Sequence, residues 1–154
     1  EIKKKNKKIK LHLIGKLQTN KVKISLKLFD YIHSLDNEKL ADILSKEENL
    51  TGKKIKYFIQ VNVGMESQKS GIEKKLLNNF YNYCVKEKKL NIIGLMIIPP
   101  NDGNEEEYFK YINDTNKSLG LSELSMGMSA DYKTALKYKT TFIRIGSLIF
   151  GPRS

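Results

Sequence analysis

Short apolar runs alternate with longer amphipathic stretches along this chain, and that alternation limits the fold more than any other feature. Six runs are rich in Ile, Val, Phe and Tyr, which favour β-strands. They are Leu11–Gly15, Tyr31–Ser34, Ile55–Val63, Ile92–Ile98, Leu124–Met128 and Phe142–Phe150. Continuous apolar runs are typical of parallel strands that are buried on both faces of a sheet.

The stretches between the runs are predicted to be helices that return the chain to a parallel neighbouring strand. Ser70 begins a capping-box pattern before a stretch in which apolar residues recur every four positions up to Cys84. Ser129 is predicted to cap a later helix that has Asp131 in its first turn. We therefore expect an α/β fold with six parallel strands, either an open doubly wound sheet or a (β/α) barrel.

Composition narrows the class of protein. Hydrophobic residues make up 40% of the 154 residues and charged residues 29%, as in globular domains, and no apolar run is long enough to span a membrane. The formal net charge is +11, but only Arg144 and Arg153 are arginines, the residue best suited to reading bases and phosphates. We therefore do not expect nucleic acid as the main partner. The single cysteine, Cys84, excludes an internal disulfide and favours a cytoplasmic location.

Two segments near the C-terminus have the residues of an anion site. In the segment 124–129 a strand is followed by Gly127 and Ser129, and in the segment 144–147 Gly146 precedes Ser147. Main-chain N–H groups at helix N-termini bind phosphate, and barrels commonly place such a site after their last two strands. Taken alone, each segment is more typical of an ordinary turn, because Gly and Ser at strand ends usually serve turns.

Other polar residues fit structural roles as well as functional ones. His12 and His33 are predicted to be packed residues, because no cluster with metal-ligand spacing surrounds them in the sequence. Gln18, Asn20 and Lys21 follow a strand and either border a site or cap the next helix. Glu66 and Lys69 follow the third run and are candidates for lining a pocket, whereas residues 105–107 are predicted to be a solvated first turn.

Taken together, several segments resemble successive blocks of a known family. The segments are HLIGKLQTNKVK, IHSLDNEKLA, IQVNVGMESQKSG, GLMIIPP, LSMGMSADY and IRIGSLIFGPR, in this order. They resemble the YggS/PROSC proteins, also called pyridoxal phosphate (PLP) homeostasis proteins, from about Leu11 to Arg153. LSMGMS, followed fifteen residues later by RIGS, is the most specific part of the resemblance.

The resemblance implies a TIM-like barrel similar to the N-terminal domain of alanine racemase. It also implies that PLP binds with its phosphate against Ser129, Gly146 and Ser147, next to Met128, and with Arg144 facing the pyridine nitrogen. An arginine stays protonated at neutral pH, so it would keep that nitrogen unprotonated and the ring a weak electron sink. Such a site suits a protein that holds the cofactor, or proton-transfer chemistry that needs little carbanion stabilisation.

The resemblance places the Schiff-base lysine in a strand upstream of Leu11. We therefore expect residues 1–154 to form one barrel domain without its first two strands, and we assign that role to no lysine of this chain. The expected function is non-catalytic PLP homeostasis, with PLP-dependent apo-enzymes as candidate recipients. The alternative is the barrel domain of a PLP-dependent racemase or decarboxylase, enzymes that normally add a second, β-rich domain.

Overall fold

Parallel strands form a curved sheet in the computed structural model, which describes residue 6 and residues 8–64 and 70–151. The sheet has the order β1-β2-β3-β5-β6-β7, and each neighbouring pair is parallel. The bounds are His12–Leu13 (β1), Tyr31–Leu35 (β2), Lys56–Asn62 (β3), Ile92–Met96 (β5), Glu123–Met128 (β6) and Phe142–Arg144 (β7). The strands follow chain order, so the six predicted parallel strands are confirmed.

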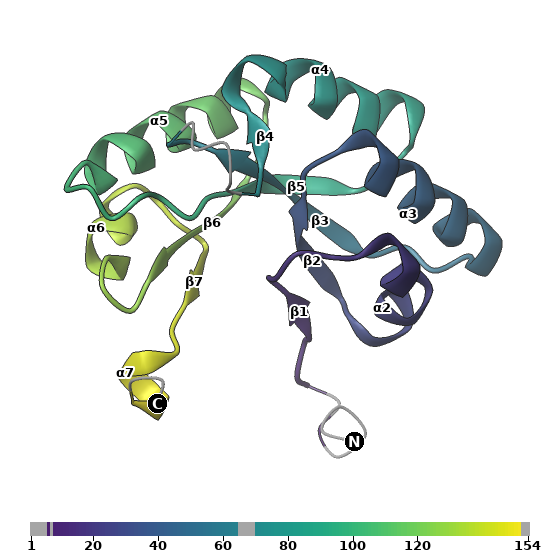
Figure 1. The fold of residues 1–154 in the computed structure, drawn as a ribbon, viewed down its shortest axis with the longest axis horizontal. Coiled ribbons are helices and arrows are strands. Elements are labelled where there is room, and N and C mark those ends of the chain that lie inside the picture. Colours follow the sequence, from purple (N-terminus) through teal and green to yellow (C-terminus); the bar gives the residue numbers. More distant parts are fainter. Residues whose placement is uncertain (1–5, 7, 65–69, 152–154) are drawn as a thin grey trace.

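Helices cover the outer face of this sheet and the whole forms an open arc (Figure 1). The longer ones are α2 (Val22–Leu28), α3 (Glu38–Thr51), α4 (Leu77–Asn82), α5 (Glu105–Ser118) and α6 (Tyr132–Lys137). Shorter helical turns are η1 (Thr19–Lys21), η2 (Lys74–Leu76) and η3 (Tyr83–Glu87), which continues α4. β1 and β7 lie at the two open ends of the arc (Figure 1).

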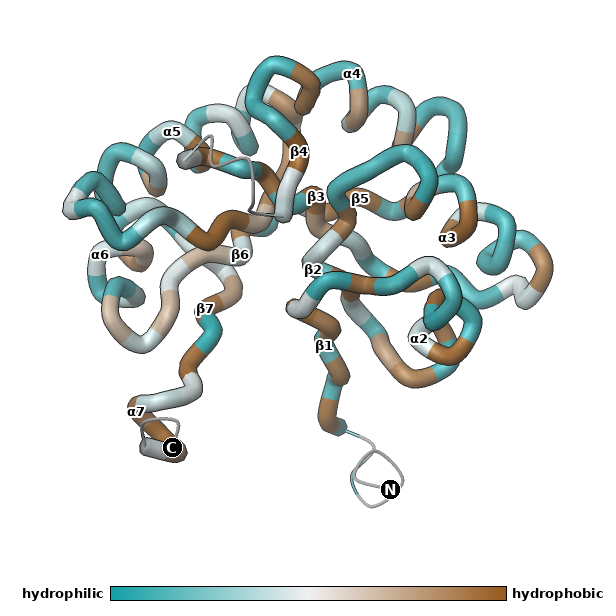
Figure 2. The backbone as a smooth tube through the Cα atoms, in the orientation of Figure 1, coloured by the Kyte–Doolittle hydropathy of each residue, from teal (hydrophilic) through white to brown (hydrophobic). Residues whose placement is uncertain are grey.

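The hydrophobic core lies between the sheet and the helices. β3 is buried from Tyr57 to Val61, as expected for a central parallel strand, and Cys84 is buried in the same core. α3 begins where the Asn37 side chain accepts a hydrogen bond from the Leu40 N–H at 2.9 Å. Figure 2 shows apolar residues gathered along the strands, whereas polar and apolar positions alternate along the helices.

The last predicted strand is too long. The run was expected to be a strand throughout residues 142–150, but β7 ends at Arg144 and Ser147–Phe150 forms a short helix, α7. β7 pairs with β6 only as far as the partners Met128 and Arg144, where β6 itself ends. Without a neighbouring strand, the rest of the apolar run satisfies its main chain locally, and Gly146 C=O accepts the N–H groups of Ile149 and Phe150.

The helix predicted to begin at Ser70 starts later. Residues Ile72–Glu73 form a short strand, β4, which pairs in parallel with β3 through Val61 and Ile72. Gly71 permits this arrangement: its φ is +123°, and a Cβ at this position would lie 2.6 Å from the main-chain nitrogen of Asn62. The capping-box spacing was therefore misleading here, because close approach of two main chains decides the local structure.

In the described part of the chain, none of the helices has the length and apolar character needed to cross a bilayer.

The inner face of the sheet is lined partly by aromatic and histidine side chains. His12, Tyr31, His33, Phe58 and Phe142 form a cluster in which the His33 and Phe58 rings stack at 4.2 Å between centroids. The ring centroids of Phe142 in β7 and His12 in β1 are also 5.5 Å apart, so residues from the two ends of the arc meet inside it.

Candidate functional site

A cavity of about 940 Å³ opens where β6 and β7 end. Its walls come from the loop after β5, the loop between β6 and α6, and the turn between β7 and α7. All the residues predicted to bind the cofactor line it: Met128, Ser129, Arg144, Gly146 and Ser147. The structure thus gathers them at one end of the sheet, and their roles stay predictions at this point.

Ser129 is not the cap that the sequence predicted. α6 begins after Asp131, and the Asp131 carboxylate accepts a hydrogen bond from the Met128 N–H at 2.5 Å. The Ser129 hydroxyl turns instead toward the start of α7, where its oxygen accepts the N–H groups of Gly146 at 3.3 Å and Leu148 at 3.5 Å. Two main-chain donors therefore converge on one oxygen in the wall of the cavity, an arrangement that also suits an anion.

Two glycines shape the turns around this point. Gly127 has a φ of +91°, and a Cβ there would lie 2.7 Å from the Cβ of Ala135 in α6. Only glycine lets β6 end so close to the helix that follows. At Gly146, by contrast, a Cβ would meet no described atom within 4 Å, so the space over this residue is open to a ligand.

Arg144 forms a half-buried wall of the cavity and links β7 to β6 and to the residue that follows β5. Its Nη1 donates to the main-chain oxygen and the hydroxyl of Ser125 at 3.0 and 2.8 Å, and its Nη2 donates to the Ile97 C=O at 2.7 Å. Burial lowers the pKa of Arg144 to about 10, while Asp131 raises it, so the side chain remains charged at neutral pH. A guanidinium has five N–H groups. The N–H on Nε and one of the two on Nη2 have no acceptor among the described residues.

Ser125 connects Arg144 to the two histidines. Its hydroxyl lies 2.8 Å from His33 Nδ1, and His33 Nε2 lies 2.9 Å from His12 Nδ1. Burial, followed by the charges of His12 and Arg144, lowers the pKa of His33 to about 3. Both histidines are packed, as predicted, but the sequence analysis missed Ser125. Its one signal was a polar residue in a buried strand, two positions before Gly127 and so on the same face.

The lining of the cavity is acidic rather than basic. It contains Glu105, Glu106 and Asp131, together with the single positive charge of Arg144. The first turn of α5, predicted to be solvated, thus contributes to the cavity wall. Glu106 also accepts a hydrogen bond from the Tyr138 hydroxyl at 2.9 Å, which holds α5 against α6. An anion would consequently have to bind at the main-chain donors rather than beside these carboxylates.

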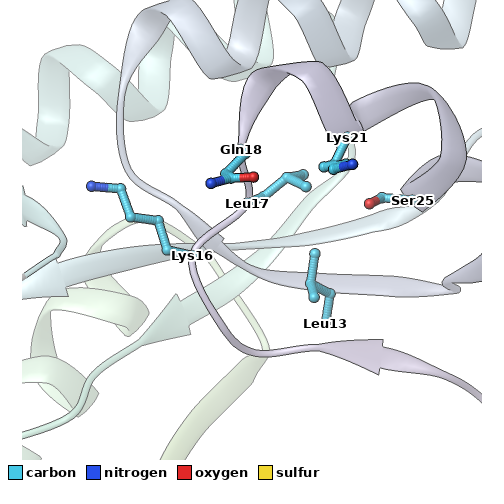
Figure 3. Close-up of a pocket in the computed structure, with 6 residues that line it drawn as sticks. All are labelled: Leu13, Lys16, Leu17, Gln18, Lys21 and Ser25. Carbon is cyan, nitrogen blue, oxygen red and sulfur yellow. The ribbon is translucent and has the colours of Figure 1, made fainter.

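A second, smaller cavity of about 320 Å³ lies between β1 and α2 (Figure 3). Gln18 and Lys21, predicted to border a site or cap a helix, line it together with Lys16 and Ser25. Gln18 precedes η1 but makes no side-chain capping bond. The Lys16 side chain extends away from the other lining residues (Figure 3), so the polar groups do not converge as they do at Ser129.

Two predicted pocket residues, Glu66 and Lys69, lie outside the described residues. Within the described ranges, no group of three or more His, Cys, Asp or Glu side chains is arranged to hold a metal ion. The larger cavity is therefore the arrangement that brings the predicted binding residues together.

Comparison with known proteins connects this geometry to a family. Residues 1–154 match the sequence model of the alanine racemase N-terminal domain. Pyridoxal phosphate homeostasis proteins from Aquifex aeolicus and Vibrio cholerae are 38% and 35% identical; each match covers 92% of this chain but 66% and 64% of the relative. The corresponding protein of Synechocystis is 34% identical, with 94% of this chain and 71% of the relative covered. The chain thus spans about two thirds of the length of these relatives.

Solved structures agree with the sequence matches. PipY of Synechococcus elongatus, solved with PLP bound, is 29% identical and superposes with a TM-score of 0.88 over 97% of this chain and 74% of that protein. Alanine racemase of Clostridium difficile is 15% identical, with a TM-score of 0.71 over 99% of this chain and 42% of that enzyme, which shows a shared fold. The arc of six strands is therefore part of a TIM-like barrel. The chain belongs to the alanine racemase N-terminal domain family, and within it to the pyridoxal phosphate homeostasis proteins.

Proposed function

We propose that this chain binds pyridoxal 5′-phosphate in the larger cavity, with the phosphate at Ser129, Gly146 and Ser147 and the ring toward Arg144. The observation that carries the proposal is the convergence of the Gly146 and Leu148 N–H groups on the Ser129 hydroxyl. Main-chain donors around an open glycine are the usual means of holding a phosphate. Met128, which lines the same cavity and is partly exposed, supplies apolar surface for the ring.

The chemistry of Arg144 fits a binding role, which needs no strong electron sink. A charged guanidinium cannot accept a proton, so a ring nitrogen that faces it accepts a hydrogen bond and stays unprotonated. When bound, the cofactor supplies an electron sink, and that sink is weak unless the ring nitrogen is protonated. We accordingly propose that the protein stores or delivers the cofactor in the cytoplasm, with PLP-dependent apo-enzymes as recipients.

Binding is best tested with pyridoxine 5′-phosphate, because this probe has no aldehyde and does not react with the many surface lysines. Isothermal titration calorimetry should show saturable binding of this probe at one site per chain. Ser129→Ala combined with Gly146→Val removes the hydroxyl and fills the open space, so we expect an affinity loss of at least about tenfold. Unchanged affinity in this double variant would contradict the proposed site.

The matched control tests whether the probe binds simply because the protein is positively charged. Lys16→Ala with Lys21→Ala removes two positive charges from the smaller cavity, which lies elsewhere on the same strongly basic protein. This variant should keep the affinity within about twofold, since screened surface charges contribute little. An equal loss in both double variants would mean that the probe binds through general charge attraction.

Absence of catalysis has its own test. With PLP and L-alanine in deuterated water, proton exchange at the amino acid Cα should not exceed the rate with free PLP. Exchange that is faster than this and abolished by Ser129→Ala with Gly146→Val would favour the racemase-type or decarboxylase-type alternative.

A further inference from the structure

Four polar side chains cross the interior of the half-barrel in an unbroken series of contacts. Arg144 from β7 contacts Ser125 from β6 at 2.8 Å, Ser125 contacts His33 from β2 at 2.8 Å, and His33 contacts His12 from β1 at 2.9 Å. We call these four residues the interior polar chain. It begins at the cavity wall and ends at the other side of the arc, so it joins strands that are far apart in the sheet order.

The interior polar chain is too buried to be incidental. Ser125 is fully buried and His33 is 1% exposed, and both lie against the inner face, where barrels usually place branched apolar residues. A buried hydroxyl or imidazole without a hydrogen-bond partner would destabilise the fold, so each link has to be satisfied. The stacking of His33 on Phe58 further fixes the imidazole plane.

The donors and acceptors run in one direction. Arginine can only donate, so the Ser125 oxygen accepts from Arg144. The hydroxyl hydrogen of Ser125 then goes to His33 Nδ1, which leaves the His33 proton on Nε2, where it is donated to His12 Nδ1. This assignment requires His33 to be neutral, in agreement with the lowering of its pKa to about 3 by burial and the neighbouring positive charges.

From this geometry we propose that Ser125 and His33 are positioning residues for Arg144: they hold its guanidinium so that the Nε–H and one Nη2–H point to the cofactor ring. The inference rests on the proposed binding of PLP in the larger cavity. It adds that recognition of the ring, as distinct from the phosphate, depends on two residues that line no part of that cavity.

The competing interpretation is that Arg144 and Ser125 merely fasten β6 to β7. The chain offers a matched control for it. The Thr140 hydroxyl lies within 3.2 Å of the main-chain oxygens of Leu124, Met126 and Phe142, so it also bridges these two strands, but it makes no contact with Arg144. Thr140→Val therefore removes a strand-bridging hydroxyl with little change in volume, whereas Ser125→Ala removes the one that holds Arg144.

The experiment compares two probes, pyridoxine 5′-phosphate and inorganic phosphate, on the chain and its two variants. For Ser125→Ala we expect about tenfold weaker binding of pyridoxine 5′-phosphate with phosphate affinity unchanged. The absorbance of the bound ring should also shift toward that of the nitrogen-protonated form. Thr140→Val should change neither affinity nor the absorbance. Ser125→Thr, which keeps the hydroxyl, should restore tight binding of the ring-containing probe.

The outcomes separate the inference from the proposed function. If the unmodified chain binds neither probe, the proposed function fails and this inference with it. If it binds pyridoxine 5′-phosphate and folded Ser125→Ala binds equally well, the inference alone is overturned. Loss of both probes in Ser125→Ala, or matching losses in Thr140→Val, would show a purely structural role. Should Ser125→Ala not fold, His33→Gln provides the same comparison of the two probes.

Discussion

The guanidinium end of the cavity, around Arg144, is held by partners that are themselves buried, Ser125 and Ile97. The hydroxyl end, around Ser129, is held instead by main-chain N–H groups of two exposed residues, Gly146 and Leu148. At the first end the links are 2.7–3.0 Å long, and at the second end they are 3.3 and 3.5 Å. One end of the candidate site is thus fixed by the core of the fold, and the other by two turns at its rim.

This difference has a physical consequence. A side chain that is already held in position by buried partners costs little to organise when a ligand arrives, because the fold has fixed it. An exposed turn can adapt to the ligand but contributes little to stability. We therefore expect changes near the core end to affect folding and ring recognition, and changes near the rim to affect phosphate binding alone.

The largest expected contrast comes from the same substitution in the packed sheet and at the rim. Gly94 lies in β5, where a Cβ would overlap the carbonyl oxygen of Glu123 in β6, so Gly94→Ala should cost about 3 kcal/mol of unfolding free energy. Gly146→Ala meets open space and should cost less than about 1 kcal/mol. Urea unfolding followed by circular dichroism measures both. Equal losses would remove the distinction between a packed core and an open rim.

The second prediction concerns pH and the core end. In the folded protein His33 has a pKa lowered to about 3, so an unfolded histidine binds a proton first as the pH falls. The unfolding free energy should therefore decrease between about pH 6.5 and pH 3, with His33 contributing about 1.4 kcal/mol per pH unit at most. His33→Gln should show a shallower slope in urea unfolding at pH 7, 6 and 5. Identical slopes would mean that His33 is not held neutral in the fold.

The smallest effect is expected at the rim. Ser129→Ala removes a hydroxyl whose two hydrogen bonds are long and exposed, so unfolding free energy should change by less than about 0.5 kcal/mol. Inorganic phosphate should nevertheless bind about fivefold more weakly. Ser118→Ala is the control, because the Ser118 hydroxyl bonds within α5 to the Thr115 C=O. A stability loss above 1.5 kcal/mol in Ser129→Ala would show that this hydroxyl belongs to the core.

The sequence predicted the rim better than the core end. Gly127, Ser129, Gly146 and Ser147 stand next to strand ends, and turn chemistry is local, so neighbouring residues carry the signal. Even there, the partner of Ser129 was wrong, because its hydroxyl finds main-chain donors 17 residues away at Gly146 rather than in the following helix.

The interior polar chain could not be predicted from the residues alone. Ser125 and His33 are 92 residues apart, and their contact exists because β2 and β6 curve toward the same interior. Strand periodicity shows which residues share a face, but it does not give the curvature that brings distant strands together across that face. The short strand β4 was not predicted for a related reason, because it depends on how closely Gly71 approaches β3.

The most direct test of the account is to map pyridoxine 5′-phosphate onto the main chain by amide chemical shifts during a titration. We expect saturable shifts that are largest at Gly146, Ser147 and Leu148, accompanied by a smaller shift at Ser125 and none around Lys21. Shifts centred on the smaller cavity between β1 and α2, or no saturation at any amide, would contradict a cofactor site at the ends of β6 and β7.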